Sequence, residues 1–206
     1  MRGIKVENPE NVFSYAAGEH GSYAILGKGH FCQETGRPLF PEKTWLCGVL
    51  IEGTKADISG MTFRGPLWVD RGAQVLADGL DMDLYSQDGT FPMPNRILNT
   101  VTRNLRTSFW ERVLCWITGN EPIGVKRARK TPLVVTGNSY LSINGVVRGL
   151  HAFNSEQDII IDASQASTIR IAGGNLKFFN RDGSEAAVLY DVKGGAHDHG
   201  VRAVQF

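Results

Sequence analysis

The chain of 206 residues has no long hydrophobic run. It contains no stretch of 18 consecutive apolar residues, which is the length that a membrane-spanning helix requires. Its first 23 residues also lack the apolar core of a secretory signal. We therefore expect a protein without a membrane span that is made and folded in a cytoplasm.

Cysteine is scarce, and net charge is almost zero. The three cysteines, Cys32, Cys47 and Cys115, form no CxxC motif, so reduced and mostly buried thiols are expected, with a disulfide or an intersubunit link as the alternative. A net charge of +1 gives no overall attraction to nucleic acid, and no nucleic-acid partner is expected. The charge is uneven, however: residues 96–130 contain eight basic and two acidic side chains, a net charge of +6.

Common catalytic motifs are missing as well. The chain has no GxSxG nucleophile motif, no phosphate-binding loop and no HExxH pair, so we expect a protein that is not an enzyme. The remaining catalytic alternative is a pair of carboxylates that cleaves a glycan. The available acidic residues are Asp57, Asp70, Asp78, Asp81, Asp83, Asp158 and Asp162. Aspartate is also common in tight turns for purely structural reasons.

Glycine, by contrast, is abundant, with 24 residues, and it separates short apolar runs. In most of these runs two apolar residues flank a single residue, so both side chains face the same side of a strand. The expected inward positions in residues 46–91 are Val49, Ile51, Ile58, Met61, Phe63, Leu67, Val69, Ala73, Val75, Leu80 and Met82. Those in residues 131–206 are Leu133, Val135, Leu141, Ile143, Leu150, Ala152, Ile159, Ile161, Ile169, Ile171, Leu176 and Phe178.

Short strands that recur with a turn after each are typical of a β-solenoid, in which every coil covers the next. The alternative is a sandwich or a barrel, which usually has longer strands. We predict a mainly β fold: a short β-solenoid with one long amphipathic helix inserted and a β-hairpin at the C-terminus. The expected segments are a loop-rich arm (1–45), a first β-solenoid block (46–91), the helix with a basic linker (92–130) and a second block with the hairpin (131–206).

The inserted segment has helical periodicity. Leu98, Val101, Leu105, Phe109, Val113 and Ile117 recur at helical spacing, and Arg96, Asn99, Arg103 and Arg106 fall largely on the other side. The pattern predicts one helix of about 24 residues, roughly 36 Å long, that begins near Asn95, ends at Gly119 and packs against a β surface.

We expect this helix to supply an interface made by Leu98, Leu105, Trp110, Trp116, Arg103 and Arg106. The basic face would suit an acidic or phosphate-bearing partner, and the two tryptophans would allow the helix to lie on a membrane. The plainer alternative is a solvated basic face with Trp110 and Trp116 in the core.

Near the C-terminus, the stretch GGAHDHGV places His197 and His199 two residues apart, so in an extended segment both imidazoles project the same way. Together with Gly195 they form a G-x-H-x-H turn. This turn resembles the iron-binding turns of trimeric fibres and spikes of tailed phages. The resemblance implies iron, or zinc, held by three chains on a threefold axis. The alternative is an exposed turn and no cofactor.

The repeats carry two family resemblances. Gly-rich strands, the HDH turn and a polar N-terminal arm resemble structural proteins of tailed bacteriophages, such as spikes, fibres and decoration proteins. The stretches VLIEGTKADISGMTFRGPLWVDRGAQVLADGL and LSINGVVRGLHAFNSEQDIIIDASQASTIRIAGG are similar to the coils of bactofilins, which polymerise into filaments.

The first resemblance implies a non-enzymatic virion protein. Its expected partners are sister subunits, as a trimer, other virion proteins and a surface glycan. The alternatives are a glycan-binding or glycan-cleaving β-helix protein and a bactofilin-like scaffold, the latter located in the cytoplasm.

Overall fold

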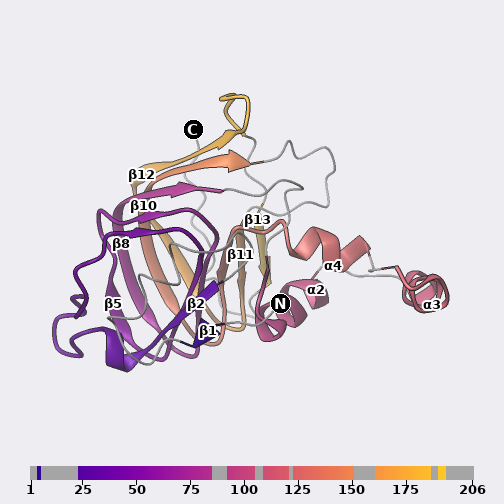
Figure 1. Cartoon of the computed structure of the whole chain (residues 1–206), viewed down its shortest axis with the longest axis horizontal. Helices are drawn as coiled ribbons and strands as arrows, with labels where there is room; N and C mark the ends of the chain where they lie inside the picture. Colours follow the sequence, from indigo (N-terminus) through magenta and orange to yellow (C-terminus); the bar gives the residue numbers. More distant parts are fainter. Residues whose placement is uncertain are drawn as a thin grey trace.

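The computed structural model describes residues 4–5, 23–84, 92–104, 109–120, 123–150, 161–186 and 190–193. It confirms a mainly β fold. Two sheets face each other, and every ladder between the described strands is parallel (Figure 1). Parallel sheets are normally buried on both faces, and here one sheet also carries helices on its outer side.

The first sheet has seven strands in the order β1-β2-β4-β7-β9-β11-β13. They are β1 (Ile4–Lys5), β2 (Tyr23–Leu26), β4 (Gly48–Glu52), β7 (Leu67–Asp70), β9 (Leu133–Val135), β11 (Ile161–Ser164) and β13 (Tyr190–Lys193). The second sheet has the order β12-β10-β8-β6-β3, and β5 also pairs with β8. Its strands are β3 (Thr44–Trp45), β5 (Lys55–Asp57), β6 (Thr62–Phe63), β8 (Gln74–Asp83), β10 (Tyr140–Leu150) and β12 (Thr168–Asn180), and a short 3-10 helix, η1 (Lys28–His30), follows β2.

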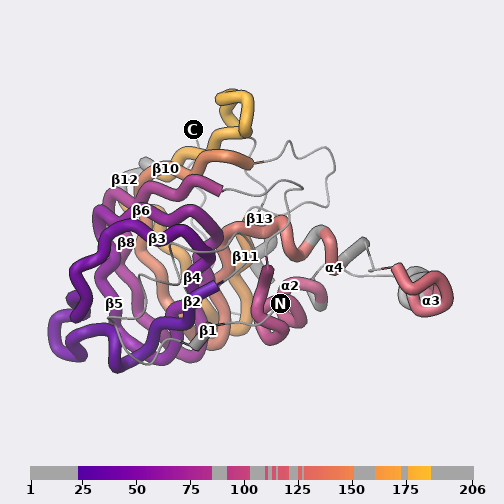
Figure 2. The backbone as a smooth tube through the Cα atoms, viewed as in Figure 1, coloured from indigo at the N-terminus to yellow at the C-terminus, as the bar shows by residue number. Residues whose placement is uncertain are grey.

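The chain passes alternately through the two sheets. We call one passage through the first sheet and then the second a circuit. The circuits are β2 with β3, β4 with β5 and β6, β7 with β8, β9 with β10, and β11 with β12. In the first sheet each circuit places its strand beside that of the previous circuit, so sequence order becomes spatial order (Figure 2).

The register aligns apolar side chains of successive circuits in columns. In the first sheet Val49 pairs with Leu67, and Leu67 pairs with Leu133. In the second sheet Val75 pairs with Leu141, which pairs with Ile169. The predicted inward positions are buried wherever the structure describes them, except Ile171, which is half-buried. Ala152 and Ile159 lie outside the described residues.

Three helices are inserted between two successive circuits, and the strands of these circuits still pair with each other. They are α2 (Asn95–Asn104), α3 (Phe109–Thr118) and α4 (Ile123–Ala128), and they lie between β8 and β9 in the chain. Nevertheless β7 pairs directly with β9, and β8 pairs directly with β10. The strands on the two sides of the insertion therefore form one continuous stack.

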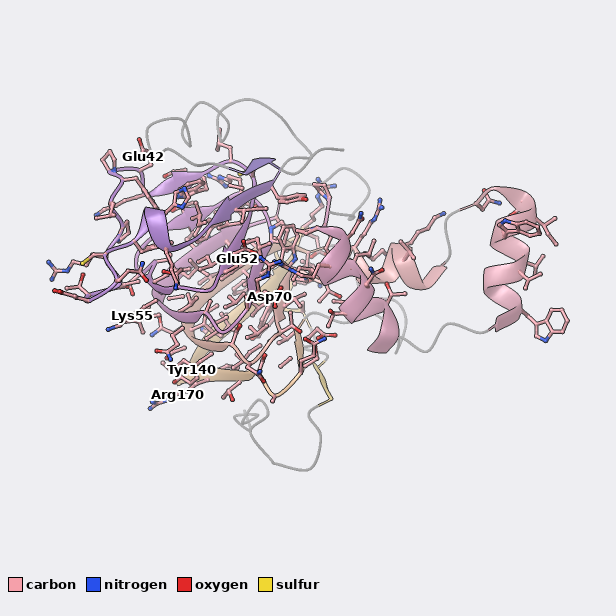
Figure 3. All side chains as sticks on the ribbon, turned by 90° about the horizontal axis from the view of Figure 1, so that it is seen from below. Glu42, Glu52, Lys55, Asp70, Tyr140 and Arg170 are labelled. Carbon is pink, nitrogen blue, oxygen red and sulfur yellow. The ribbon has the colours of Figure 1, made fainter. Side chains whose placement is uncertain are left out.

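The single helix predicted for this insertion is not confirmed. The structure has two ten-residue helices, α2 and α3, which lie apart and point in different directions (Figures 1 and 3). Residues 105–108, which separate them, lie outside the described residues. The predicted end at Gly119 agrees with the structure, because α3 ends at Thr118 and Gly119 has a φ of 68°.

Within the described residues, the predicted C-terminal hairpin corresponds to a short antiparallel feature. A turn at Asp182 and Gly183 brings Phe179 and Glu185 into an isolated antiparallel bridge. The next strand, β13, does not pair with β12 but returns to the first sheet, where it pairs in parallel with β11. With β13 the described chain thus enters the first sheet once more, beside β11.

Gly145 shows how closely neighbouring circuits approach. It lies within β10, pairs with Leu80 of β8 and has a φ of 129°. A Cβ atom at this position would lie 2.7 Å from the backbone nitrogen of Leu80. We expect Gly145→Ala to lower the free energy of unfolding by about 2–3 kcal/mol, because it adds a backbone clash to an unfavourable φ.

Gly60 is the matched control for this prediction. Its φ is 67°, but nothing lies within 4 Å of an added Cβ. Gly60→Ala should lower the free energy of unfolding by about 1 kcal/mol, because alanine is less stable than glycine in the left-handed conformation. Urea titration of both variants measures the difference, and equal losses would show that the circuits do not approach as closely as described.

Candidate docking surface

The three helices form an arm at one side of the stack, next to the first sheet (Figure 1). We call α2, α4 and α3 together the helical arm. Of these, α2 lies nearest the sheets and α3 lies farthest away in both views (Figures 1 and 3). The arm therefore has a base, formed by α2 and α4, and a tip, formed by α3.

The base covers the outer face of the first sheet. Strand residues alternate between faces, so Leu50 and Trp68 point away from the interior column of Val49 and Leu67. Leu50 and Trp68 are nevertheless buried, as are Ile97 and Val101 of α2. The ring of Tyr23 packs edge-on against Trp68, with centroids 5.8 Å apart. Burial of these α2 side chains agrees with the prediction of an amphipathic helix beside a β surface, over the first half of the predicted segment.

An ion-pair cluster fixes the base to the ends of two strands. Glu52 ends β4 and Asp70 ends β7, and these two residues pair in the sheet. Arg96 of α2 places Nη2 2.6 Å from Oε2 of Glu52 and Nε 2.5 Å from Oδ2 of Asp70. Figure 3 shows both carboxylates between the sheets and α2. We call Arg96, Glu52 and Asp70 the anchor.

Asp70 is the most buried member of the anchor, with 5% of its side chain exposed. Its Oδ1 accepts a hydrogen bond from the backbone nitrogen of Arg71 at 2.7 Å. The side chain of Arg71 lies 3.4 Å from Glu52 but is 61% exposed. The helical pattern predicts Arg96 on the solvent side of the helix, but in the structure it faces the sheet, because the buried Asp70 and the partly buried Glu52 lie within its reach.

The tip presents an apolar surface to solvent. The exposed fractions are 71% for Trp110, 61% for Leu114, 85% for Trp116 and 69% for Ile117. Trp110, Leu114 and Ile117 are spaced as neighbours on one face of a helix. Trp116 projects from another side of the same helix. Large apolar side chains that are exposed together on one short helix make α3 a candidate interaction surface.

The predicted interface residues are divided between base and tip. Leu98 is half-buried against the core, whereas Trp110 and Trp116 are exposed on α3. The alternative that these tryptophans belong to the core is wrong. Arg103 lies in α2, but its side chain is outside the described part of the structure. Leu105 and Arg106 lie outside the described residues altogether.

The predicted metal turn cannot be placed, because His197 and His199 lie outside the described residues. Within the described ranges, no group of three or more His, Cys, Asp or Glu side chains is arranged to hold a metal ion. Iron or zinc at the HDH turn therefore stays a prediction. In the part of the chain that the structure describes, no helix has the length and apolar character needed to cross a membrane.

Several of the acidic residues considered for glycan cleavage are bound to neighbouring circuits. Asp81 pairs with Arg148, and Asp83 pairs with Arg64. Asp78 accepts a hydrogen bond from Asn144, and Asp57 accepts one from the backbone of Ser59. Asp162 is buried in β11, and Asp158 lies outside the described residues. Asp78, Asp81 and Asp83 therefore link neighbouring circuits, and Asp57 stabilises its own turn.

An open groove of about 620 Å³ lies at the carboxyl ends of β8, β10 and β12. Among the described residues that line it are Arg148, Lys177, Phe179 and Arg181, and Asp83 is the one carboxylate. Glycan cleavage requires two carboxylates, and the described residues of this groove provide one of them, Asp83. Lys177 and Arg181 are exposed there.

Two cysteines differ sharply in chemical environment. Cys32 is half-buried, and hydrogen bonds from Thr35 lower the pKa of its thiol. Cys47 is buried, and desolvation raises the pKa of its thiol to about 11. Both are free thiols, as the sequence predicts. The side chain of Cys115 lies outside the described part of α3.

This difference predicts selective thiol modification in a Cys115→Ser background. The thiolate is the reactive form, so Cys32 should react with a disulfide reagent at a half-maximal pH below the usual thiol value. Cys47 should react only after unfolding. Thr35→Ala, which removes the first cause of the shift, should raise the half-maximal pH of Cys32. Stopped-flow measurements against pH test this, and similar rates for both thiols in the native protein would contradict it.

No protein-family model, no curated protein and no solved structure matches this chain. The class that the described residues define is a mainly β protein with two parallel sheets and a helical arm.

Proposed function

We propose that this chain is a non-enzymatic structural protein whose body is a β-solenoid and whose helical arm docks that body onto a neighbouring component. The alternating passage through two parallel sheets, with each circuit paired to the previous one, supports the solenoid. Its resemblance to spike, fibre and decoration proteins supports a place in a virion.

The observation that carries this proposal is the contrast between the two ends of the arm. The base is held to the sheet by the anchor, so the arm starts from a fixed point. The tip exposes four large apolar side chains, each with more than half of its surface accessible to solvent. A rigid base and an uncovered apolar tip are suited to attachment rather than to chemistry.

The ends of the stack support assembly of several copies. Among the described strands, β12, which has 13 residues, pairs on one side only, with β10. Open strand edges invite uncontrolled pairing, and symmetric oligomers are a common way to cover them. We propose a trimer, the symmetry that the HDH turn implies.

Native mass spectrometry of the purified full chain tests this proposal. We expect a single species of three copies that persists at micromolar concentration. A monomer at that concentration would contradict the proposal. An open-ended series of masses would favour the bactofilin-like scaffold, and release of reducing ends from an acidic polysaccharide would favour the glycan-cleaving alternative.

A further inference from the structure

We infer that the surface on which α3 docks is an anionic lipid bilayer, with the helix lying in the plane of the head groups. This inference rests on the docking role proposed for the arm and names its partner. The argument uses the apolar surface of α3, its length and the charge of the segments around it.

The composition of α3 suits a membrane interface. Its ten residues carry two charged side chains, Glu111 and Arg112, which contribute no net charge. Trp110 and Trp116 are exposed, and tryptophan favours the interface because its ring is apolar and its N–H is polar. At 1.5 Å per residue the helix is about 15 Å long, which suits lying along a bilayer rather than crossing it.

The flanking segments supply the attraction to anionic lipid. Arg96 is held in the anchor, and Arg129 and Lys130 are half-buried, but residues 98–128 still carry five basic and two acidic side chains, a net charge of +3. Lys126 of α4 is exposed there. Each basic residue near an anionic membrane contributes about 1 kcal/mol. Apolar insertion and charge attraction together give the two signals that stable membrane association requires.

The remainder of the chain has the opposite charge. The whole chain carries +1 and residues 96–130 carry +6, which leaves −5 on the rest. An anionic surface therefore attracts the arm more strongly than the remainder of the chain, which favours an approach with the arm toward the membrane. A protein partner would need an acidic groove that matches the arm. An anionic bilayer combines negatively charged head groups with an apolar interior over its whole surface.

Vesicle sedimentation of the full chain tests the inference. We expect binding to vesicles of phosphatidylcholine mixed with phosphatidylglycerol, at least about tenfold weaker binding to phosphatidylcholine alone, and a comparable loss between about 0.05 and 0.5 M salt. Tryptophan emission should shift to the blue on binding. Trp45 and Trp68 are already buried, so this shift reports on Trp110 and Trp116.

Matched variants separate the tip from the rest of the surface. Leu114 and Leu39 are exposed to nearly the same extent, 61% and 59%. Leu114→Glu should weaken binding at least about tenfold, whereas Leu39→Glu should change it less than about twofold. Lys126→Glu should weaken binding to anionic vesicles more than Lys55→Glu, which alters an exposed lysine of the second sheet.

The inference is overturned if the protein binds neither kind of vesicle, or if the Leu39 and Leu114 variants lose binding equally. Binding to polyglutamate without binding to anionic vesicles would also overturn it and would indicate an acidic protein partner. Native mass spectrometry of the same preparation keeps the two proposals apart. If the protein is a trimer that does not bind vesicles, the membrane partner is refuted and the proposed assembly is not.

Discussion

Val75→Asp is expected to unfold the protein, whereas Leu76→Asp, one residue further along the same strand, should leave it folded. Val75 is 2% exposed and belongs to an interior column, between Ala56 and Leu141. Leu76 points to the other side of β8 and is 45% exposed. A buried unpaired carboxylate should lower the free energy of unfolding by about 4 kcal/mol or more.

The comparison is informative because the two substitutions add the same charge to the same strand. Leu76→Asp should change the free energy of unfolding by less than about 1 kcal/mol, as is usual at exposed positions. Urea denaturation followed by circular dichroism gives both values. If the two variants lose similar amounts, the alternation of inward and outward side chains along β8 is wrong.

Arg96→Met should produce the second large loss, about 2–3 kcal/mol in the free energy of unfolding. The substitution keeps an apolar stem but leaves Glu52 and Asp70 without their cation, and Asp70 is almost fully buried. Removing one partner of a buried ion pair costs about 3–5 kcal/mol. We expect somewhat less here because the side chain of Arg96 is 35% exposed.

Arg71→Met is the control for the anchor. Arg71 also lies near Glu52, at 3.4 Å, but is mostly exposed, and such ion pairs contribute about 0–1 kcal/mol. Hydrogen exchange adds a second readout, because loss of the anchor should weaken amide protection in α2 more than in β10. Equal effects of the two substitutions would show that Arg96 does not hold the arm.

Much of the interior could be predicted from the sequence, because strand alternation is a local property. Pairs such as Val49 with Ile51 and Leu141 with Ile143 reveal which side chains point inward, whatever lies beside the strand. The helical periodicity around Leu98 and Val101 likewise predicts α2 and its buried face. These signals depend on backbone geometry alone.

The remaining features depend on contacts between distant residues, which local patterns do not contain. Arg96 meets Glu52 and Asp70 only because β4 and β7 are neighbours and α2 folds back onto them. Arg64 and Arg148 reach Asp83 and Asp81 in the same way. The return of β13 to β11 is equally non-local.

The candidate docking surface was predicted in part. Trp110 and Trp116 fall within the segment of helical periodicity, but the sequence does not place them on an exposed helix. An apolar stripe has the same sequence pattern whether it covers a sheet or awaits a partner. The division of the insertion into α2 and α3 decides between these outcomes, and the continuous helical periodicity concealed it.

The order of the stacked circuits is the central claim, and engineered disulfides test it most directly. In a background without the native cysteines, Leu76→Cys with Ser142→Cys joins positions that pair between β8 and β10. Neighbouring strands lie about 4.8 Å apart, within the range for a disulfide. We expect this pair to cross-link within one chain, and Leu76→Cys with Arg170→Cys, two circuits apart, to remain reduced. Cross-linking of the second pair but not the first would contradict the stack.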